Sequence, residues 1–328
     1  MRKAYQDARE RAVSINRSTR GRIVVSGADR ASYLHALLTN DINALKPGTG
    51  CYSAYLTPQG RMISDLWVYE LGDVILLDLP DIATKDVVLA KLDQLIFSED
   101  VQLGDVTDAF AQVAVVGPDA ARIVGILVDH ADTVAALPEN GCLRAAIASG
   151  AAIVTRIKDA GESGFDVYVE QAQLDVVRRI LTSERVEEAD VETVDVLRVE
   201  AGIPLFHRDM DENTIPLEAG IEPRAISLNK GCYVGQEVII RVLHRGHGRV
   251  AKKLTGLSME SDAVPQTGAA VMSGDREIGT VTSAVWSIAL DRPIAMAYLQ
   301  RDFLEAGTTV SVDGHVAIVT SLPFLTRQ

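Results

Sequence analysis

Three pairs of sequence landmarks recur about 90 residues apart in the first half of this chain. The segment 25–29, Val-Ser-Gly-Ala-Asp, is matched by 115–119, Val-Val-Gly-Pro-Asp. Cys51 is matched by Cys142, and the Asp-Val-Val of 86–88 is matched by that of 175–177. Because self-similarity at a fixed spacing indicates a repeated folding unit, we expect two related lobes. Cys51 and Cys142 would then begin matching strands and be buried.

The first of these lobes is predicted to be a sheet with helices packed on one face. A β-branched run at 22–25 indicates a strand, and apolar residues at helical spacing follow it. The apolar runs 62–71 and 74–79 are separated only by Gly72-Asp73, which is typical of a hairpin. A helix is expected at 81–95 and a closing strand at 101–106.

The pattern of hydrophobic and turn-forming residues changes after Arg249. Short alternating strands separated by glycines follow, as in the Ile-Gly-Thr-Val-Thr of 278–282, and this pattern is typical of a small β-barrel. The predicted fold class is therefore α+β, with two related ferredoxin-like α/β lobes and a C-terminal small β-barrel. We place the lobes at 1–108 and 109–248 and the barrel at 249–328.

Composition limits the partners of the chain. The 45 acidic residues exceed the 32 basic ones and give a net charge of −13, which disfavours extended binding to nucleic acid. The three cysteines are widely spaced and odd in number, so a disulfide framework is not expected and a reducing compartment is. No apolar run approaches the roughly 18 residues that span a bilayer. We expect a cytoplasmic protein, or one of the mitochondrial matrix if the source is eukaryotic.

The amino-terminal segment, residues 1–22, is rich in arginine, as mitochondrial transit peptides are. Asp7 and Glu10 count against a transit peptide, because such peptides are poor in acids. We prefer a surface helix for this segment.

The segment 230–237, Lys-Gly-Cys-Tyr-Val-Gly-Gln-Glu, is unlike any other in the chain. Gly231 and Gly235 permit positive φ and close approach of the backbone, which suits a turn that faces a ligand. Lys230 and Arg241 bring positive charge toward Cys232, and nearby cations favour the reactive thiolate. The alternative is that Cys232 is a small buried hydrophobe, the commoner fate of a free cysteine.

This segment, followed by Arg241, resembles the signature of the YgfZ family of folate-binding proteins, which support iron–sulfur proteins and are relatives of the glycine-cleavage T-protein. The stretches 38–41, 60–66, 197–204 and 216–220 are also similar to segments of that superfamily. The resemblance implies two α+β lobes, a C-terminal barrel, a central ligand channel and tetrahydrofolate, or a derivative of it, as the cofactor. It also implies that Cys232 matters for iron–sulfur proteins.

The pterin of folate presents adjacent donors that a buried carboxylate accepts well. Glu200 is the best candidate, because a carboxylate near the negative end of a helix needs a partner; the alternative is a pair with Arg198 or exposure to water. Asp65 matches the aspartate that positions one-carbon chemistry in the T-protein family, and burial would raise its pKa. Tyr69 lies on the same strand face, where it could contact the benzoyl ring of folate or belong to the core.

The carboxylates of the folate tail are expected to bind positively charged side chains of the protein. Within the signature segment, Lys230 and Gln236 are further candidates for contact with folate. A basic island follows, made of Arg241, His244, Arg245, His247, Arg249, Lys252 and Lys253. It could bind a polyglutamate tail or an RNA backbone, or be a solvated linker into the barrel. Aromatic residues for base stacking are missing from the island, so the RNA interpretation is weak.

Three functions remain open. The first is a tetrahydrofolate-binding accessory protein for iron–sulfur cluster assembly or repair, with Cys232 as its functional thiol and iron–sulfur client proteins as partners. One cysteine cannot hold a cluster alone, so any cluster would be transient or shared. The second is a folate-dependent aminomethyltransferase that uses Asp65, and the third is a partner in RNA modification. We favour the first, without steady turnover, because the signature segment marks the accessory branch.

Overall fold

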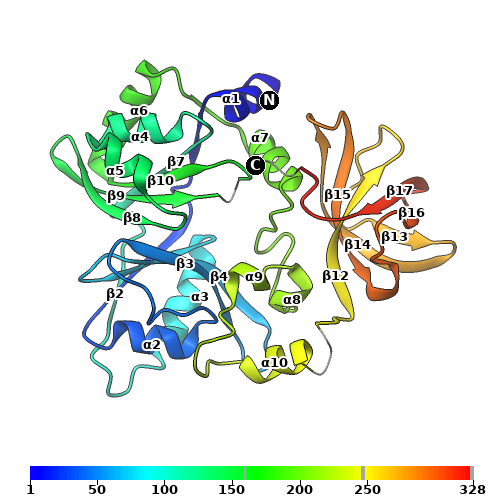
Figure 1. Ribbon diagram of the computed structural model, residues 1–328, viewed down its shortest axis with the longest axis horizontal. Helices are drawn as coiled ribbons and strands as arrows, with labels where there is room; N and C mark the ends of the chain where they lie inside the picture. Colours follow the sequence, from blue (N-terminus) through cyan, green and yellow to red (C-terminus); the bar gives the residue numbers. More distant parts are fainter. Residues whose placement is uncertain (159, 245–247, 326–328) are drawn as a thin grey trace.

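The computed structural model describes residues 1–158, 160–244 and 248–325, which form two lobes and a barrel (Figure 1). In the first lobe, five strands pair in the order β3-β4-β5-β2-β6. The hairpin predicted at Gly72-Asp73 is confirmed, since β4 pairs antiparallel with β5. The elements of this lobe are β2 (Gly21–Ser26), α2 (Arg30–Leu37), β3 (Thr49–Leu56), β4 (Met62–Glu70), β5 (Ile75–Leu79), α3 (Ile82–Asp93) and β6 (Gln102–Asp105).

The second lobe contains a six-stranded sheet in the order β11-β1-β7-β10-β9-β8. Apolar side chains of α4 and α6 pack with this sheet in a continuous core. The elements are α1 (Arg2–Glu10), β1 (Val13–Asn16), β7 (Phe110–Val116), α4 (Ala120–Val128), α5 (Ala131–Ala136), β8 (Cys142–Ile147), β9 (Gly150–Ile157), β10 (Gly164–Glu170), η1 (Gln171–Gln173), α6 (Leu174–Ser183) and β11 (Glu187–Glu188).

Four strands follow the same order in the two sheets, as the repeated landmarks predict. Strands β3, β4, β5 and β2 of the first lobe correspond to β8, β9, β10 and β7 of the second. Gly27 and Gly117 end the matching strands β2 and β7 with φ values of +101° and +128°. A Cβ at Gly27 would lie 2.0 Å from the carbonyl oxygen of Asp100, so both the conformation and the space require glycine there.

Strand β1 interrupts this correspondence. It lies between β7, to which it is antiparallel, and β11, to which it is parallel. In the first lobe, β6 pairs directly with β2. The amino-terminal strand is thus inserted into the second sheet, and the predicted lobe boundary at residue 108 follows the sheets only in part. Sequence pattern misses this insertion because β1 is short and its pairing partners lie far along the chain.

The barrel closes as predicted, with strand order β12-β15-β14-β13-β16-β17 and pairing of β17 with β12. Its elements are β12 (Lys252–Met259), β13 (Ala270–Ser273), β14 (Arg276–Ser287), β15 (Arg292–Gln300), η2 (Arg301–Phe303), β16 (Thr309–Val312) and β17 (His315–Thr320). Four helices precede it, namely α7 (Val191–Glu200), α8 (Pro216–Ala219), α9 (Glu222–Ala225) and α10 (Gln236–His244). Among the described helices, none has both the length and the apolar character to cross a bilayer.

Helices α8 to α10 return from the second lobe to the first, and α8 and α9 lie between the lobes and the barrel (Figure 1). The hydroxyl of Thr39 donates to the carbonyl of Ala225 at 2.7 Å, and the amide of Met62 donates to the carbonyl of Thr214 at 2.9 Å. Apolar side chains from all three helices join the core under β3 and β4. Much of the segment 206–244, assigned from sequence to the second lobe, therefore packs against the first.

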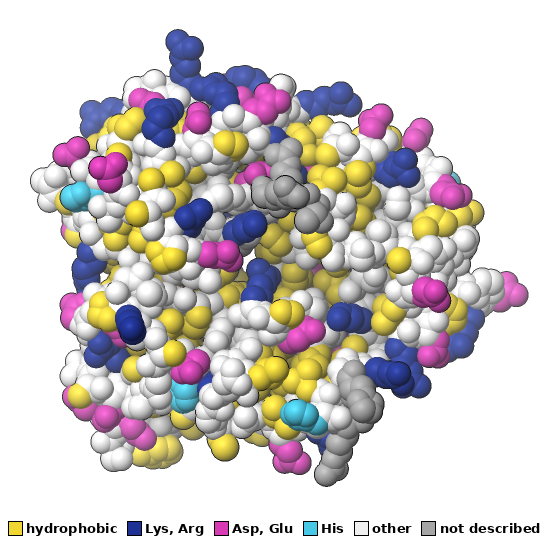
Figure 2. Space-filling view, in the orientation of Figure 1, with side chains coloured by type: hydrophobic (Ala, Val, Ile, Leu, Met, Phe, Trp, Pro, Cys, Tyr) yellow, Lys and Arg dark blue, Asp and Glu magenta, His cyan; other side chains and the backbone are white. Residues whose placement is uncertain are grey.

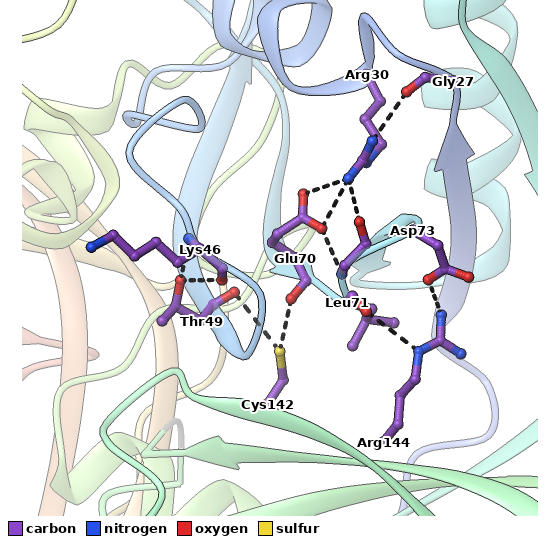
Figure 3. Close-up of polar contacts among 10 residues, drawn as sticks. Gly27, Arg30, Lys46, Thr49, Glu70, Leu71, Asp73, Cys142 and Arg144 are labelled. Atoms are coloured by element: carbon purple, nitrogen blue, oxygen red, sulfur yellow. Dashed lines mark hydrogen bonds and ion pairs between the residues drawn. The ribbon is translucent and has the colours of Figure 1, made fainter.

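The two lobes meet at an ordered polar junction (Figure 3). The thiol of Cys142, at the start of β8, lies 3.5 Å from the carbonyl oxygen of Glu70, at the end of β4. Arg30 binds the carboxylate of Glu70, and Arg144 binds Asp73. Burial raises the pKa of the Cys142 thiol to about 12, so this cysteine is a neutral structural group, as expected.

Asp209 connects α7 to the barrel. Its fully buried carboxylate accepts hydrogen bonds from Arg198 of α7 at 2.7 Å and from the hydroxyls of Thr282 and Ser283 of β14 at 2.6 and 2.7 Å. Arg198 is buried as well. Two buried opposite charges that pair in this way are stable together. Removing one of them is strongly destabilising, because the other charge then stays buried without a partner.

We therefore expect Asp209→Ala to lower the free energy of unfolding by about 3–5 kcal/mol, because the Arg198 guanidinium would remain buried without its counter-charge. Arg178→Ala serves as the control, since Arg178 forms an ion pair with Asp175 on an exposed helix face. This control should cost about 1 kcal/mol or less. Urea unfolding followed by circular dichroism measures both. Equal losses in the two variants would contradict a structural role for the Asp209 pair.

Candidate functional site

The hairpin of β3 and β4 places three polar or aromatic side chains on one face of the first sheet. Tyr52 of β3 is directly opposite Trp67 of β4, and Ala54 is opposite Asp65. Since side chains alternate along a strand, Asp65 and Trp67 share a face, and Tyr52 shares it across the strand pair. The rings of Tyr52 and Trp67 are in contact, with centroids 4.9 Å apart.

Asp65 has one satisfied and one unsatisfied carboxylate oxygen. The hydroxyl of Tyr52 donates to Oδ2 at 2.7 Å. Oδ1 is buried and accepts no hydrogen bond from the described part of the chain. Burial raises the pKa of Asp65 above its ordinary value, although the bond from Tyr52 and the charges of Arg20 and Arg224 oppose this shift. A buried acceptor without a partner is costly, so Oδ1 is a natural site for a ligand donor.

Two adjoining cavities, each of about 300 Å³, open beside these residues. The first, which we call the Asp65 cavity, is also lined by Arg20, Pro204 and His207. The second, the Lys158 cavity, is also lined by Glu139, Asn140 and Leu325. Four residues line both, namely Tyr52, Trp67, Ile203 and Arg224. The two cavities therefore adjoin along a wall made of these four residues, and together we call them the central channel.

The lining of the central channel combines aromatic surface with positive charge. The guanidinium carbon of Arg224 lies 4.5 Å from the centroid of the Tyr52 ring, a cation–π arrangement. Arg20 reaches the first cavity while its Nε donates to the buried Asp78 at 2.6 Å. Figure 2 shows hydrophobic side chains gathered where the two lobes meet the barrel, with Lys and Arg side chains among them.

Glu200, predicted to bind the pterin, has protein partners instead. Its carboxylate is fully buried and accepts hydrogen bonds from the hydroxyls of Tyr5 at 2.7 Å and Ser287 at 2.6 Å, and it forms an ion pair with Arg9. It lines neither cavity of the central channel. These contacts join α1, α7 and the barrel, so they argue for a structural role and against contact with folate.

Tyr69 likewise does not line the central channel. It is fully buried, and its ring is parallel to that of Trp67 with centroids 6.4 Å apart. Of the aromatic residues on this face of β4, Trp67 reaches the channel and Tyr69 supports it. The structure thus favours the core alternative for Tyr69.

Cys232 lies on an exposed loop before α10. Lys230, expected to activate its thiol, donates from Nζ to the carbonyl oxygens of His35, Leu38 and Asn40 at and beyond the end of α2. Burial lowers the pKa of Lys230 to about 8. The ammonium thus satisfies backbone groups that a helix end leaves unpaired, and it anchors the loop that carries Cys232.

The remaining predicted contacts lie away from the central channel. Gln236 begins α10, and Arg241 is exposed on the same helix. None of Cys232, Lys230, Gln236 and Arg241 lines either cavity. In the basic island, Lys252 lies over the ring of Tyr298 and Lys253 approaches Glu222 at 3.9 Å. Arg245 and His247 lie outside the described residues.

Sequence reasoning missed Tyr52, Trp67, Arg224 and Arg20 as channel residues. Trp67 carried a usable signal, because it is two residues after Asp65 on a predicted strand and so had to share its face. Tyr52 and Arg224 carried no such signal in the sequence. The position of Tyr52 depends on strand register, and that of Arg224 depends on the return of α9 to the first lobe.

The raised pKa of Asp65 predicts a pH dependence of stability. A carboxyl group whose pKa is higher in the folded state binds more protons there, so its contribution to stability declines as pH rises from 3.8 through the folded value. Asp65→Asn removes this titration and keeps an acceptor for Tyr52. The variant should therefore gain stability relative to the parent as pH rises from 4 to 8. Urea unfolding across this range tests it, and a constant difference would refute the assignment.

Comparisons with known proteins agree with this architecture. Residues 1–230 match the family model of the GCVT N-terminal domain, and residues 252–325 match that of the glycine cleavage T-protein C-terminal barrel domain. The chain is 32% identical to the aminomethyltransferase of Rubrobacter xylanophilus, covering 99% of this chain and 86% of that protein. It is also 32% identical to the aminomethyltransferase of Streptomyces coelicolor, covering 100% and 90%.

The fold has a solved counterpart. The crystal structure of glycine cleavage system aminomethyltransferase T from Bartonella henselae superimposes with a TM-score of 0.87, covering 98% of this chain and 89% of that one at 24% identity. At this identity the structural similarity shows the fold alone. The family assignment comes from the two family models, which together cover most of the chain. The chain therefore belongs to the glycine cleavage T-protein family.

Proposed function

We propose that the central channel binds tetrahydrofolate and that the protein transfers an aminomethyl-derived one-carbon unit to it, as the names of its relatives suggest. The observation that carries this proposal is the buried Oδ1 of Asp65, an unpartnered acceptor at the wall of a cavity. A site of this kind is completed by a ligand that donates a hydrogen bond.

The residues of the channel fit such a ligand. A reduced pterin has N–H donors along its edge, and Oδ1 of Asp65 offers the matching acceptor. The rings of Trp67 and Tyr52 provide flat apolar surface for the pterin or benzoyl group. At the other end, Lys158 offers positive charge to the carboxylates of the glutamate tail, and Arg224, which lines both cavities, adds to it. Two joined cavities of about 300 Å³ each are of the size that small ligands occupy.

Asp65 is suited to handling protons in this reaction. Tetrahydrofolate, when bound, supplies two nitrogens that accept the one-carbon unit. The raised pKa of Asp65 means that its carboxylate accepts a proton more readily than an ordinary aspartate does. Tyr52 holds Oδ2 and so fixes the orientation of the carboxyl group, leaving Oδ1 to face the acceptor nitrogens.

Isothermal titration with tetrahydrofolate tests the binding site. Trp67→Leu should weaken binding about tenfold, equivalent to 1.4 kcal/mol, because it removes an aromatic surface from the channel. Trp286→Leu is the matched control, since Trp286 belongs to β14 of the barrel and does not line the central channel. If both variants bind tetrahydrofolate as the parent does, the ligand occupies some other site.

A second function is favoured by the position of Cys232, an accessory role in iron–sulfur cluster assembly or repair. Burial raises the pKa of Cys51 and of Cys142 to about 12, which leaves them as neutral thiols. Cys232 is exposed and lies in the segment that resembles the YgfZ signature. The thiol is available to a partner, whereas aminomethyl transfer at Asp65 makes no use of it.

Turnover separates the two functions. With tetrahydrofolate and an aminomethyl donor, the parent protein should form methylene-tetrahydrofolate, and Asp65→Asn should lower kcat by about 10² or more, since it removes a proton acceptor. Cys232→Ser should leave turnover unchanged. Absence of turnover in the parent, combined with a loss of iron–sulfur enzyme activity in cells that carry only Cys232→Ser, would instead establish the accessory role.

A further inference from the structure

His207 has a backbone conformation that side chains rarely adopt. Its φ is +66°, in the left-handed region that favours glycine. The residue lies just after Phe206, and its amide donates to the carbonyl of Met210 at 2.6 Å in a tight turn. Strain of this kind persists where the surrounding structure enforces it, and it is concentrated at functional sites.

A hydrogen-bonded relay orients the imidazole of His207. The carboxylate of Asp81 caps α3 by accepting from the amide of Thr84 at 2.8 Å, and it accepts from the hydroxyl of Thr84 at 2.8 Å as well. The same hydroxyl lies 2.8 Å from Nε2 of His207. Because the only proton of the hydroxyl is given to Asp81, the hydroxyl must accept from Nε2.

This relay selects one tautomer. Nε2 carries the hydrogen of the neutral ring, and Nδ1 carries the free electron pair. No described residue forms a hydrogen bond with Nδ1. A carboxylate that fixes the tautomer and orientation of a histidine, here through a hydroxyl, is the arrangement that makes an imidazole an effective base.

His207 also separates two cavities. It lines the Asp65 cavity, and it lines a second cavity of about 310 Å³ beside α3, which we call the α3 groove. Met62, Ile63 and Val87 give the α3 groove an apolar wall, and of these Val87 is exposed at the surface of the protein. The His207 side chain is 46% exposed, so one titratable ring borders both the interior channel and the outside.

The charged neighbours of the ring come from several elements. Asp81, at the start of α3, approaches Nε2 at 3.6 Å. Lys91 of α3 and Glu212 line the α3 groove, and they bring opposite charges to it. Arg20 and Arg224 line the Asp65 cavity on the other side. Of these groups, the negative Asp81 is the one in direct contact with the ring.

We propose that His207 is the second proton-transfer residue of the central channel, acting through Nδ1 together with Asp65. This inference rests on the proposed aminomethyl transfer. In that reaction the one-carbon unit arrives as a methylene carbon that is bonded to an amine nitrogen and to an atom of its carrier. Both of these bonds break, and two bonds form from the carbon to the acceptor nitrogens of tetrahydrofolate. The two N–H protons of the acceptor end on the amine, which leaves as ammonia, and on the carrier atom. Two protons move, and both Asp65 and His207 line the cavity where they do so.

The test compares His207→Asn and His207→Gly with the parent. Asn tolerates the left-handed conformation and does not titrate, and its shorter side chain ends at the position of Nδ1 and no longer reaches Thr84. Its kcat should fall by about 10², and the parent's change in rate between pH 5 and 8 should disappear. His207→Gly relieves the backbone and opens space for a ring, so added imidazole should restore its turnover. Neither variant should unfold at a lower temperature than the parent, which excludes misfolding as the cause.

Four outcomes overturn the inference. A parental rate and pH profile in His207→Asn, with Asp65→Asn inactive, would overturn it and leave the proposed function standing. Failure of imidazole to restore His207→Gly would count against Nδ1 as the acting atom, and so would a ¹⁵N spectrum showing Nδ1 protonated in the neutral ring. A parent protein without turnover would remove the proposed function and this inference together.

Discussion

The arrangement of the molecule depends on two opposite charges buried two residues apart on α7. Arg198 binds Asp209 and Ser283, while Glu200 binds Tyr5, Arg9 and Ser287. The first set of bonds ties α7 to the barrel, and the second ties it to both the barrel and the amino-terminal helix. The chain leaves α7 at Ala201 and runs directly along the central channel, which Ala201 and Ile203 line. The wall of the channel is therefore positioned by charges that themselves never face it.

Much of this architecture follows from the sequence. The repeated landmarks identify the paired lobes, the alternating short strands identify the barrel, and an aspartate inside an apolar strand identifies Asp65 as unusual. These signals can be read along the chain without knowledge of its tertiary contacts, since each depends on spacing or on neighbours along one strand. Glu200 differs, because its donors Tyr5, Arg9 and Ser287 come from opposite ends of the chain. Local pattern shows that a buried carboxylate needs a partner, but only the tertiary fold decides whether that partner is protein or ligand.

The candidate site combines features that oppose stability. Asp65 is desolvated with one oxygen unpaired, and His207 has a backbone conformation better suited to glycine. Lys230 shows the contrasting case, in which a partly buried cation has three acceptors and holds a loop in place. Unpaired groups around a cavity and paired groups elsewhere are what a binding site on a stable scaffold requires. The contrast also separates Asp65 and His207 from Glu200, although all three side chains are titratable.

Strand β1 ties together parts of the chain that lie on either side of the first lobe. All five strands of the first sheet lie between Gly21 and Asp105. The second sheet contains β1, which precedes them along the chain, and also β7 to β11, which follow them. The first lobe is therefore a closed loop of the chain, whose two ends are held together by the pairing of β1 with β7 and β11. The same segment supplies Tyr5 and Arg9 to Glu200, so residues 1–16 complete both the second sheet and the contacts that hold Glu200 against the barrel.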